Sequence, residues 1–343
     1  MVIKKRFAVK KPTQHDVAQL AGVSQTTVSL VLNNPEVASV PEETRQKVFN
    51  AMHSLGYVVN SAARMLRTNR SYTLVCIIPM ITNPFYPAFV SGIQEVAEQN
   101  GYDVITYNTH GSQERERKFL RSILEGRVDG VIGIFFYTQA RDMTQLFEVN
   151  IPVVRLEVRE HRSGEWPLDS IYIDNAQAAC QATAYLLGKG HRRVAMLTGP
   201  AGPRDARKEG YLTALKSHSD DLQPWVQEVD SYNETGGYQG MRIILESGDP
   251  PTAVFAANDL MAIGAMKAIR DAGLVVPKDV AVVGFDDIPA AQMVTPALTT
   301  IRQFQEEMGK RAAQLLIERL NGDAPSIGRI VEMPYELVIR ESA

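Results

Sequence analysis

Apolar residues recur every three or four positions between residues 13 and 57, a pattern that predicts three short helices. Thr13 is placed to cap the first helix and Gly22 to end it, because a hydroxyl accepts first-turn N–H bonds and glycine adopts the left-handed conformation. Ser24 caps the second helix, and the third begins at Pro41. In chain order, their inner faces are expected to hold Val17, Ala18, Leu20 and Ala21; Val28, Val31 and Leu32; and Thr44, Val48, Ala51 and Leu55.

From residue 72 onward the pattern changes to short apolar runs that alternate with helical stretches. Strands are predicted at 73–79, 103–107, 130–136, 152–156, 170–173, 193–198, 252–256 and 280–285. Helices are predicted at 86–100, 114–125, 176–189, 207–217, 235–247 and 258–272. Continuous apolar strands between helices indicate parallel sheets covered on both faces. About 270 residues suffice for two such sheets, with a lobe boundary near 169–175.

Charge divides the chain into a basic head and an acidic body. Residues 1–70 contain ten Lys or Arg and four Asp or Glu, a net charge of +6. Because the whole chain has a net charge of −3, residues 71–343 carry −9. A cationic head attracts a phosphate backbone whatever the charge of the body. The alternative is a solvated basic face without a partner.

The remaining composition narrows the class of protein. Cys76 and Cys180 offer neither a disulfide framework nor metal-ligand spacing, so they are expected to be buried thiols, and neither metal nor cofactor is predicted. No apolar run is long enough to span a membrane, and the basic opening Met1–Lys11 is not followed by the apolar segment of an export signal. A cytoplasmic protein without a membrane partner is expected.

Residues Asp16–Asn33 form two short helices joined by a glycine-containing turn, the pattern of a helix-turn-helix that places its second helix in a DNA major groove. Gln pairs with adenine and the Thr methyl group contacts thymine, so the outward residues of this helix suit base edges. Ser24 and Thr27 suit phosphate oxygens. The alternative is any small helical bundle. The predicted outward residues are Gln25, Thr26, Ser29 and Asn33.

Several motifs in the same order and spacing resemble the LacI/GalR family of repressors over almost the whole chain. They are Asp16–Asn33, Val40-Pro-Glu-Glu-Thr-Arg45, Leu55-Gly-Tyr57 and Asn60-Ser-Ala-Ala-Arg-Met-Leu-Arg67. The resemblance implies a small all-α helix-turn-helix domain followed by an α/β two-lobed, periplasmic-binding-protein-like domain with two doubly wound parallel sheets. It implies a homodimer on a pseudo-palindromic double-stranded operator. The expected divisions are a basic extension 1–11, a DNA-binding domain 12–59, a hinge 60–71 and an effector domain 72–343, with the chain crossing back near 300.

In that family the segment matching residues 61–67 is a hinge helix, and the leucine matching Leu66 wedges into the minor groove. An isolated helix of about eight residues is marginal in water, so DNA and a partner helix would be needed to order it. The alternative is that Leu66 packs on the bundle. Leu30 departs from the Arg or His of familiar members, and the extension is longer than usual. The expected DNA contacts are Ser24, Gln25, Thr26, Thr27, Ser29, Asn33, Tyr57, Ala63, Leu66 and Arg67.

Polar residues follow three strands of the predicted second lobe: Arg207, Asn258 and Asp286. Ligands of doubly wound sheets bind at the carboxyl ends of strands, so these groups are expected to converge on one cleft. An arginine fork, an amide and a carboxylate suit a vicinal diol. Aromatic residues from the facing lobe would cover the apolar face of a sugar ring; they are Phe85, Tyr86, Phe136 and Tyr137.

The resemblance implies that Arg207, Asn258 and Asp286 bind the effector and that Tyr232 is a wall residue, with Arg204, Glu157 and Phe85 as further candidates. Asp259 is instead expected to cap the helix that follows it. The predicted effector is a small polar molecule, a sugar or sugar derivative. A nucleobase, a nucleoside or a partner protein remains an alternative. An inducer and a corepressor would use the same cleft.

Two other classes of protein remain as alternatives. A periplasmic-type sugar-binding protein would share the two-lobed body but needs an export signal and has no use for residues 13–70. An enzyme needs a nucleophile or a paired acid and base, and Gly-x-Ser-x-Gly, Gly-x-x-x-x-Gly-Lys-Ser/Thr and His-Glu-x-x-His are all missing from the sequence. His191 is interpreted as a turn residue. The sequence therefore predicts a repressor without enzymatic activity.

Overall fold

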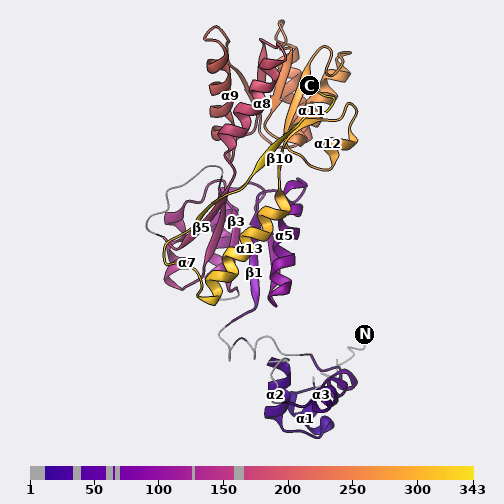
Figure 1. Ribbon diagram of the computed structural model, residues 1–343, viewed down its shortest axis with the longest axis vertical. Helices are drawn as coiled ribbons and strands as arrows, with labels where there is room; N and C mark the ends of the chain where they lie inside the picture. The colour runs from indigo at the N-terminus through magenta and orange to yellow at the C-terminus, as the bar shows by residue number, and fades with distance from the viewer. Residues whose placement is uncertain (1–11, 34–39, 59–64, 66–69, 126–127, 158–165) are drawn as a thin grey trace, which may run out of the picture. The chain divides into compact units, whose positions relative to one another are not determined.

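The computed structural model describes residues 12–33, 40–58, 65, 70–125, 128–157 and 166–343 (Figure 1). The chain divides into two compact units, Met1–Ser71 and Tyr72–Ala343. The predicted basic extension and most of the predicted hinge, including Ala63, Leu66 and Arg67, lie outside the described residues.

The first unit is a three-helix bundle of α1 (Gln14–Ala21), α2 (Gln25–Asn33) and α3 (Glu42–Leu55). Thr13 caps α1 in a capping box with Asp16, and Gly22 ends the helix in the left-handed conformation. The Ser24 hydroxyl accepts a hydrogen bond of 3.0 Å from the Thr27 backbone N–H and so caps α2. The bundle is closed by apolar side chains from all three helices, among them Val17, Val28, Val31, Val48 and Ala51.

Leu20 was placed on the inner face of the first helix, and this prediction is wrong. Its side chain is 55% exposed, whereas Val17, Ala18 and Ala21 are buried. At 100° per residue, the three buried positions span one sector of about 100°, and Leu20 lies about 60° outside it.

Two six-stranded sheets form the second unit, which confirms the predicted fold class. The first sheet has the order β11-β5-β4-β3-β1-β2, and every pair in it is parallel. Its strands are β1 (Thr73–Ile78), β2 (Asp103–Asn108), β3 (Gly130–Ile134), β4 (Val153–Glu157), β5 (Leu168–Tyr172) and β11 (Ile330–Glu332).

The second sheet has the order β12-β10-β9-β8-β6-β7 and is parallel except for β12, which runs antiparallel to β10. Its strands are β6 (Val194–Thr198), β7 (Trp225–Glu228), β8 (Ala253–Ala256), β9 (Ala281–Asp286), β10 (Thr299–Gln303) and β12 (Tyr335–Val338). The central strands β8 and β9 are buried along their whole length, as expected for a sheet covered on both faces.

Helices cover both sheets (Figure 1). Two glycines allow α5 and α13 to cross closely: a Cβ on Gly92 would lie 2.0 Å from the Glu306 carbonyl oxygen, and one on Gly309 would lie 2.0 Å from that of Phe89. The helices of the second unit are α5 (Phe85–Gln99), α6 (Gln113–Ile123), η1 (Ala140–Met143), α7 (Thr144–Glu148), α8 (Asn175–Gly188), α9 (Arg204–His218), α10 (Glu234–Leu245), α11 (Asp259–Asp271), α12 (Ala290–Met293) and α13 (Gln305–Asn321).

Three chain segments pass between the two lobes: residues 173–174, residue 304, and residues 333–334, which join β11 of one sheet to β12 of the other. Near the last crossing, the fully buried Asp169 accepts hydrogen bonds from Arg319 (2.6 Å) and Arg329 (2.8 Å). Burial alone would raise the pKa of Asp169, but these two guanidinium groups outweigh burial and lower it. The carboxylate therefore ties β5 to α13 and to the start of β11.

Across the part of the chain that the structure describes, no helix has the length and apolar character needed to span a bilayer.

Candidate ligand pocket and DNA-reading surface

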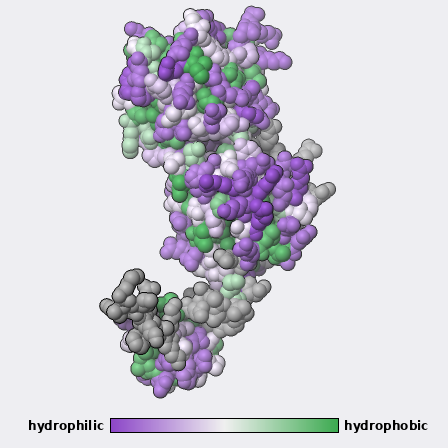
Figure 2. Space-filling model, turned by 180° about the vertical axis from the view of Figure 1, so that it is seen from behind, coloured by the Kyte–Doolittle hydropathy of each residue, from purple (hydrophilic) through white to green (hydrophobic). Residues whose placement is uncertain are grey.

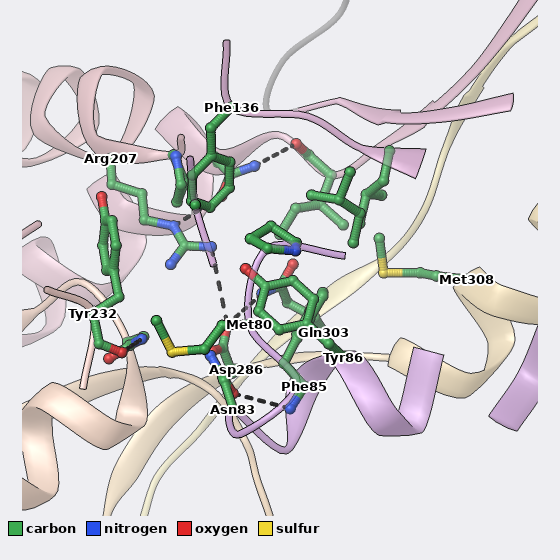
Figure 3. A pocket seen from close by; sticks show the side chains of 18 residues that line it. Met80, Asn83, Phe85, Tyr86, Phe136, Arg207, Tyr232, Asp286, Gln303 and Met308 are labelled. Atoms are coloured by element: carbon green, nitrogen blue, oxygen red, sulfur yellow. Dashed lines mark hydrogen bonds and ion pairs between the residues drawn. The ribbon is translucent and has the colours of Figure 1, made fainter. Parts of the chain in front are cut away.

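A pocket lies between the two lobes, at the carboxyl ends of their strands (Figure 3). Its space, including its open mouth, is about 760 Å³. The pocket combines polar groups with aromatic and aliphatic side chains. The lining residues are Pro79, Met80, Asn83, Phe85, Tyr86, Gly111, Ile134, Phe136, Leu156, Ile173, Asn175, Pro203, Arg207, Tyr232, Asn258, Asp286, Gln303 and Met308.

Arg207, near the start of α9, is the buried cation of the pocket, with 5% of its surface exposed. Its Nε donates to Asn175 Oδ1 at 2.9 Å, and its Nη1 donates to the Ala257 carbonyl oxygen. The guanidinium group also lies 3.5 Å above the centre of the Phe285 ring. These contacts hold the guanidinium plane in one orientation, and the remaining Nη2 faces Asp286.

Asp286 ends β9 and is the buried carboxylate of the pocket. Its Oδ1 lies 4.0 Å from Arg207 Nη2 and accepts a hydrogen bond of 2.6 Å from Gln303 Nε2. Burial raises the pKa of Asp286 to about 6, although Arg207, Gln303 and Asn83 oppose that shift. A carboxylate that is desolvated and only partly compensated is primed to accept hydroxyl donors from a ligand.

The backbone at this position is strained, because Asp286 has φ 124° and Asp287 φ 56°. Two ion pairs on the next side chain hold the turn in place: Asp287 pairs with Arg302 at 2.7 Å and with Arg340 at 2.6 Å. The carboxylate of Asp286 is therefore aimed into the pocket by a fixed backbone.

Aromatic residues from both lobes form the wall beside these polar groups (Figure 3). The Phe85 and Tyr86 rings meet edge to face at 5.2 Å between centroids. Phe136 of the first lobe approaches Tyr232 of the second at 6.5 Å, and a Cβ on Gly202 would lie 2.6 Å from the Phe136 ring. The two lobes therefore touch across the pocket, through Phe136.

Asn258, and not Asp259, caps α11. Asn258 Oδ1 accepts a hydrogen bond from the Met261 backbone N–H (2.8 Å), and Asn258 Nδ2 donates one to the Tyr232 carbonyl oxygen (3.1 Å). The fully buried Asp259 instead accepts the Ile288 N–H bond at 2.8 Å. The sequence assigned the cap one residue too late, an error within the usual uncertainty of helix ends.

Of the predicted effector residues, Arg207, Asn258, Asp286, Tyr232, Phe85 and Tyr86 line the pocket. Arg204 is not among the lining residues, because its guanidinium group bonds to Asp205 and to the Pro200 carbonyl oxygen, each at 2.9 Å. Glu157 ends β4, and its side chain lies outside the described part of the structure. Tyr137 is exposed and lines a different cavity.

Sequence reasoning missed three polar residues of the pocket: Asn83, Asn175 and Gln303. Asn175 and Gln303 flank crossings between the lobes, and Asn83 precedes α5, where its Oδ1 accepts the Phe85 N–H bond at 3.0 Å. Asn83 lies in the segment after β1 and Asp286 is the last residue of β9, so both lie at the carboxyl ends of strands, and the strand-end rule that found Asp286 also applies to Asn83. Gln303 required knowledge of β10, which the apolar pattern did not reveal.

The outward side of α2 carries the predicted base-reading residues. Ser24, Gln25 and Thr26 are exposed, Thr27 and Ser29 are partly exposed, and Leu30 is 40% exposed. The side chain of Asn33 is outside the described set, and Tyr57 packs at the edge of the bundle core. A short capped helix with small polar groups on its free face matches the recognition helix of a helix-turn-helix.

A DNA-reading bundle joined to a two-lobed ligand-binding body defines a ligand-responsive DNA-binding protein. Residues 13–60 match the family model described as bacterial regulatory proteins, lacI family, and residues 183–343 match the periplasmic binding protein-like domain. The chain belongs to the lacI family of bacterial regulatory proteins. It is a DNA-binding transcriptional repressor controlled by a small effector.

Similarity to known members extends over nearly the whole chain. The ribose operon repressor of Escherichia coli (strain K12) is 35% identical over 310 residues, 90% of this chain and 93% of the relative. The HTH-type transcriptional repressor PurR of Vibrio vulnificus (strain CMCP6) is 33% identical over 335 residues, 96% of this chain and 98% of the relative. The lac repressor dimer bound to operator and the anti-inducer ONPF superimposes with a TM-score of 0.82 at 28% identity, covering 97% of this chain and 99% of that chain.

Proposed function

We propose that the pocket between the lobes binds a sugar or sugar derivative and that its occupancy controls operator affinity. The observation that carries the proposal is the pairing of Arg207 and Asp286 beside the aromatic wall. Both side chains are buried, and Arg207 Nη2 lies 4.0 Å from Asp286 Oδ1. A polyol hydroxyl can accept from the guanidinium and donate to the carboxylate, and the apolar face of a sugar ring fits the rings of Phe136 and Tyr86. Asn258 and Tyr232 complete the site, while Arg204 and Glu157 stay outside the proposal.

The DNA-binding form is proposed to be a homodimer on a pseudo-palindromic operator. Two copies of α2 would enter successive major grooves, with Gln25 and Thr26 at base edges and Ser24 at phosphate. The predicted contacts of Asn33, Tyr57, Ala63, Leu66 and Arg67 remain part of the proposal. The lac repressor dimer bound to operator supports this arrangement for a chain of the same family.

Ligand control requires that the effector bind the open and closed arrangements of the lobes with different affinity. Phe136 meets the second lobe at Gly202 and Tyr232, so closure would compress this contact. Whether closure strengthens or weakens the grip on DNA decides between corepressor and inducer. We further infer a cytoplasmic location and no catalytic turnover of the ligand.

A nucleoside is the second candidate effector, favoured by the aromatic pair Phe85 and Tyr86 and by similarity to a purine repressor. A thermal-shift screen of the full chain over pentoses, hexoses, purine bases and nucleosides distinguishes the two classes. A ligand at 100 times its Kd adds about 2.7 kcal/mol to stability. The proposal expects the largest shift from a sugar, and a shift given only by purine bases or nucleosides would contradict it.

A further inference from the structure

The first lobe contains a second cavity, on α6 and the segment that follows β3. Arg117 and Arg121 of α6 and Arg141 of η1 line it, together with Tyr137 and Thr138. Its space, including its open mouth, is about 1110 Å³, and it shares no lining residue with the effector pocket. This cavity is therefore a separate place at which a small molecule can bind.

Three exposed arginines line this cavity. Across the described residues, Arg117, Arg121 and Arg141 form no ion pair, and the one lining carboxylate, Asp142, accepts the Gln139 N–H bond at 2.8 Å. Like charges spaced four residues apart, as Arg117 and Arg121 are, destabilise a helix. The three positive charges also contrast with the net charge of residues 71–343, which is −9. A bound anion would remove this repulsion.

Exposed hydrophilic side chains are dense on the first lobe in Figure 2, and several charged residues elsewhere in the body are ion-paired. Arg329 bonds to Asp169, and Lys310 pairs with Glu95 at 2.9 Å. The three arginines of the cavity are distinguished by their position, because they line one hollow from two elements, α6 and η1.

We propose that this cavity binds a small phosphate monoester. Arginine forks bind phosphate oxygens bidentately, and a phosphate near pH 7 carries a charge of about −1.5 to −2, which matches several guanidinium groups better than one carboxylate does. The floor of the cavity is apolar, formed by Leu120 and Leu146, and Gln113 and Gln145 offer amides at its side. An organic body attached to the phosphate has both apolar and polar groups to contact.

A single buried residue links this cavity to the effector pocket. Glu116, which precedes Arg117, is fully buried, and its carboxylate accepts the N–H bonds of Phe136 (2.8 Å), Tyr137 (3.2 Å) and Thr138 (2.9 Å). Tyr137 and Thr138 line the arginine cavity, and Phe136 lines the effector pocket. A phosphate ester that draws α6 toward η1 therefore moves the segment that carries the Phe136 ring. This coupling, unlike the binding itself, rests on the proposed function.

Titration calorimetry of the full chain with glycerol 3-phosphate, and with glycerol as the neutral control, tests the binding. The wild type should bind the phosphate ester and not glycerol, and affinity should fall as the pH is lowered through about 6, where the phosphate gains a proton. The double variant Arg117→Gln/Arg121→Gln should lose at least tenfold in affinity. Arg115→Gln, on the same helix but outside the cavity lining, should bind as the wild type does.

Absence of phosphate binding in the wild type, or equal binding by the double variant, would overturn the proposal. Asp286→Asn must keep phosphate binding, because loss there would place the ester in the effector pocket instead. If the double variant loses operator affinity with no phosphate present, the arginines serve DNA and the proposal is wrong. Phosphate binding without any sugar response would leave this site standing while the proposed function fails.

Discussion

Replacing Asp286 with asparagine separates the stability of the pocket from its function. Asparagine has nearly the same shape as aspartate and keeps one oxygen that can accept a hydrogen bond from Gln303 Nε2. In the wild type this nitrogen lies 2.6 Å from Asp286 Oδ1. The change removes the negative charge and replaces one acceptor oxygen with an amide NH2 donor. Because that charge is buried, the variant should be more stable than the wild type while it binds effector less well.

The gain in stability follows from the direction of the pKa shift. The pKa of Asp286 is raised from 3.8 to about 6 in the folded chain, so folding favours the protonated side chain. Its favourable contribution is complete below about pH 4 and is lost as the pH rises through about 6. A shift of about two units corresponds to about 3 kcal/mol. The raised pKa already includes the favourable charge of Arg207, so we expect a gain of up to about 3 kcal/mol at pH 7.

The loss in effector affinity follows from hydrogen-bond strength. A hydrogen bond to a charged group contributes about 1.5–3 kcal/mol and a neutral one about 0.5–1.5 kcal/mol. Two ligand hydroxyls on Asp286 would therefore lose about 2 kcal/mol together, roughly a thirtyfold weaker affinity.

Thermal unfolding of wild type and Asp286→Asn at pH 7 and pH 4, with and without the sugar that gives the largest shift, checks both parts. The melting temperature of the variant should be higher at pH 7 and equal at pH 4, and its ligand-induced shift should be smaller. A variant that is less stable at pH 7, or that keeps the full ligand-induced shift, would refute the reasoning.

Three further substitutions test other parts of the structure. Gln25→Ala should reduce discrimination at one operator base pair by about 1–3 kcal/mol and leave the salt dependence of DNA binding unchanged. Gel-shift titrations with operator variants measure both quantities. Equal weakening of binding to all sequences would contradict a base contact. Phe136→Ala should weaken effector binding in calorimetry, since the contact between lobes at Gly202 is lost, and unchanged affinity would exclude this contact from closure. Asp169→Asn should lower the free energy of unfolding in urea by about 3–5 kcal/mol, because the guanidinium groups of Arg319 and Arg329 lose their buried carboxylate partner. A small effect would show that water replaces the carboxylate. Since the pKa of Asp169 is lowered, its contribution is present above about pH 4 and lost in acid.

The helix-turn-helix and eight of the twelve described strands, β1 to β6, β8 and β9, were predictable because each is specified by local sequence, whereas β7, β10, β11 and β12 were not predicted. Thr13 and Gly22 mark the ends of α1 by the chemistry of their own side chain and backbone, and the apolar runs of β8 and β9 are continuous because both faces are covered. The strand-end rule also brought Arg207 and Asp286 to one cleft.

The parts that sequence did not predict depend on contacts between distant segments. β10 leads into the second crossing between the lobes, α13 follows that crossing, and β12 follows the third. β10 carries Gln303 into the pocket. Nothing near residue 303 signals that it will face a carboxylate 17 positions earlier in the chain. The same holds for Asn175, whose role depends on Arg207 of the next helix in the lobe.

The most direct test of the central claim is the affinity of the full chain for a duplex selected from a random library, measured by fluorescence anisotropy with and without the sugar identified by thermal shift. We predict that the sugar changes the affinity of the wild type at least fivefold and leaves that of Asp286→Asn nearly unchanged. Failure to select any preferred duplex, or an equal response in both proteins, would contradict the account.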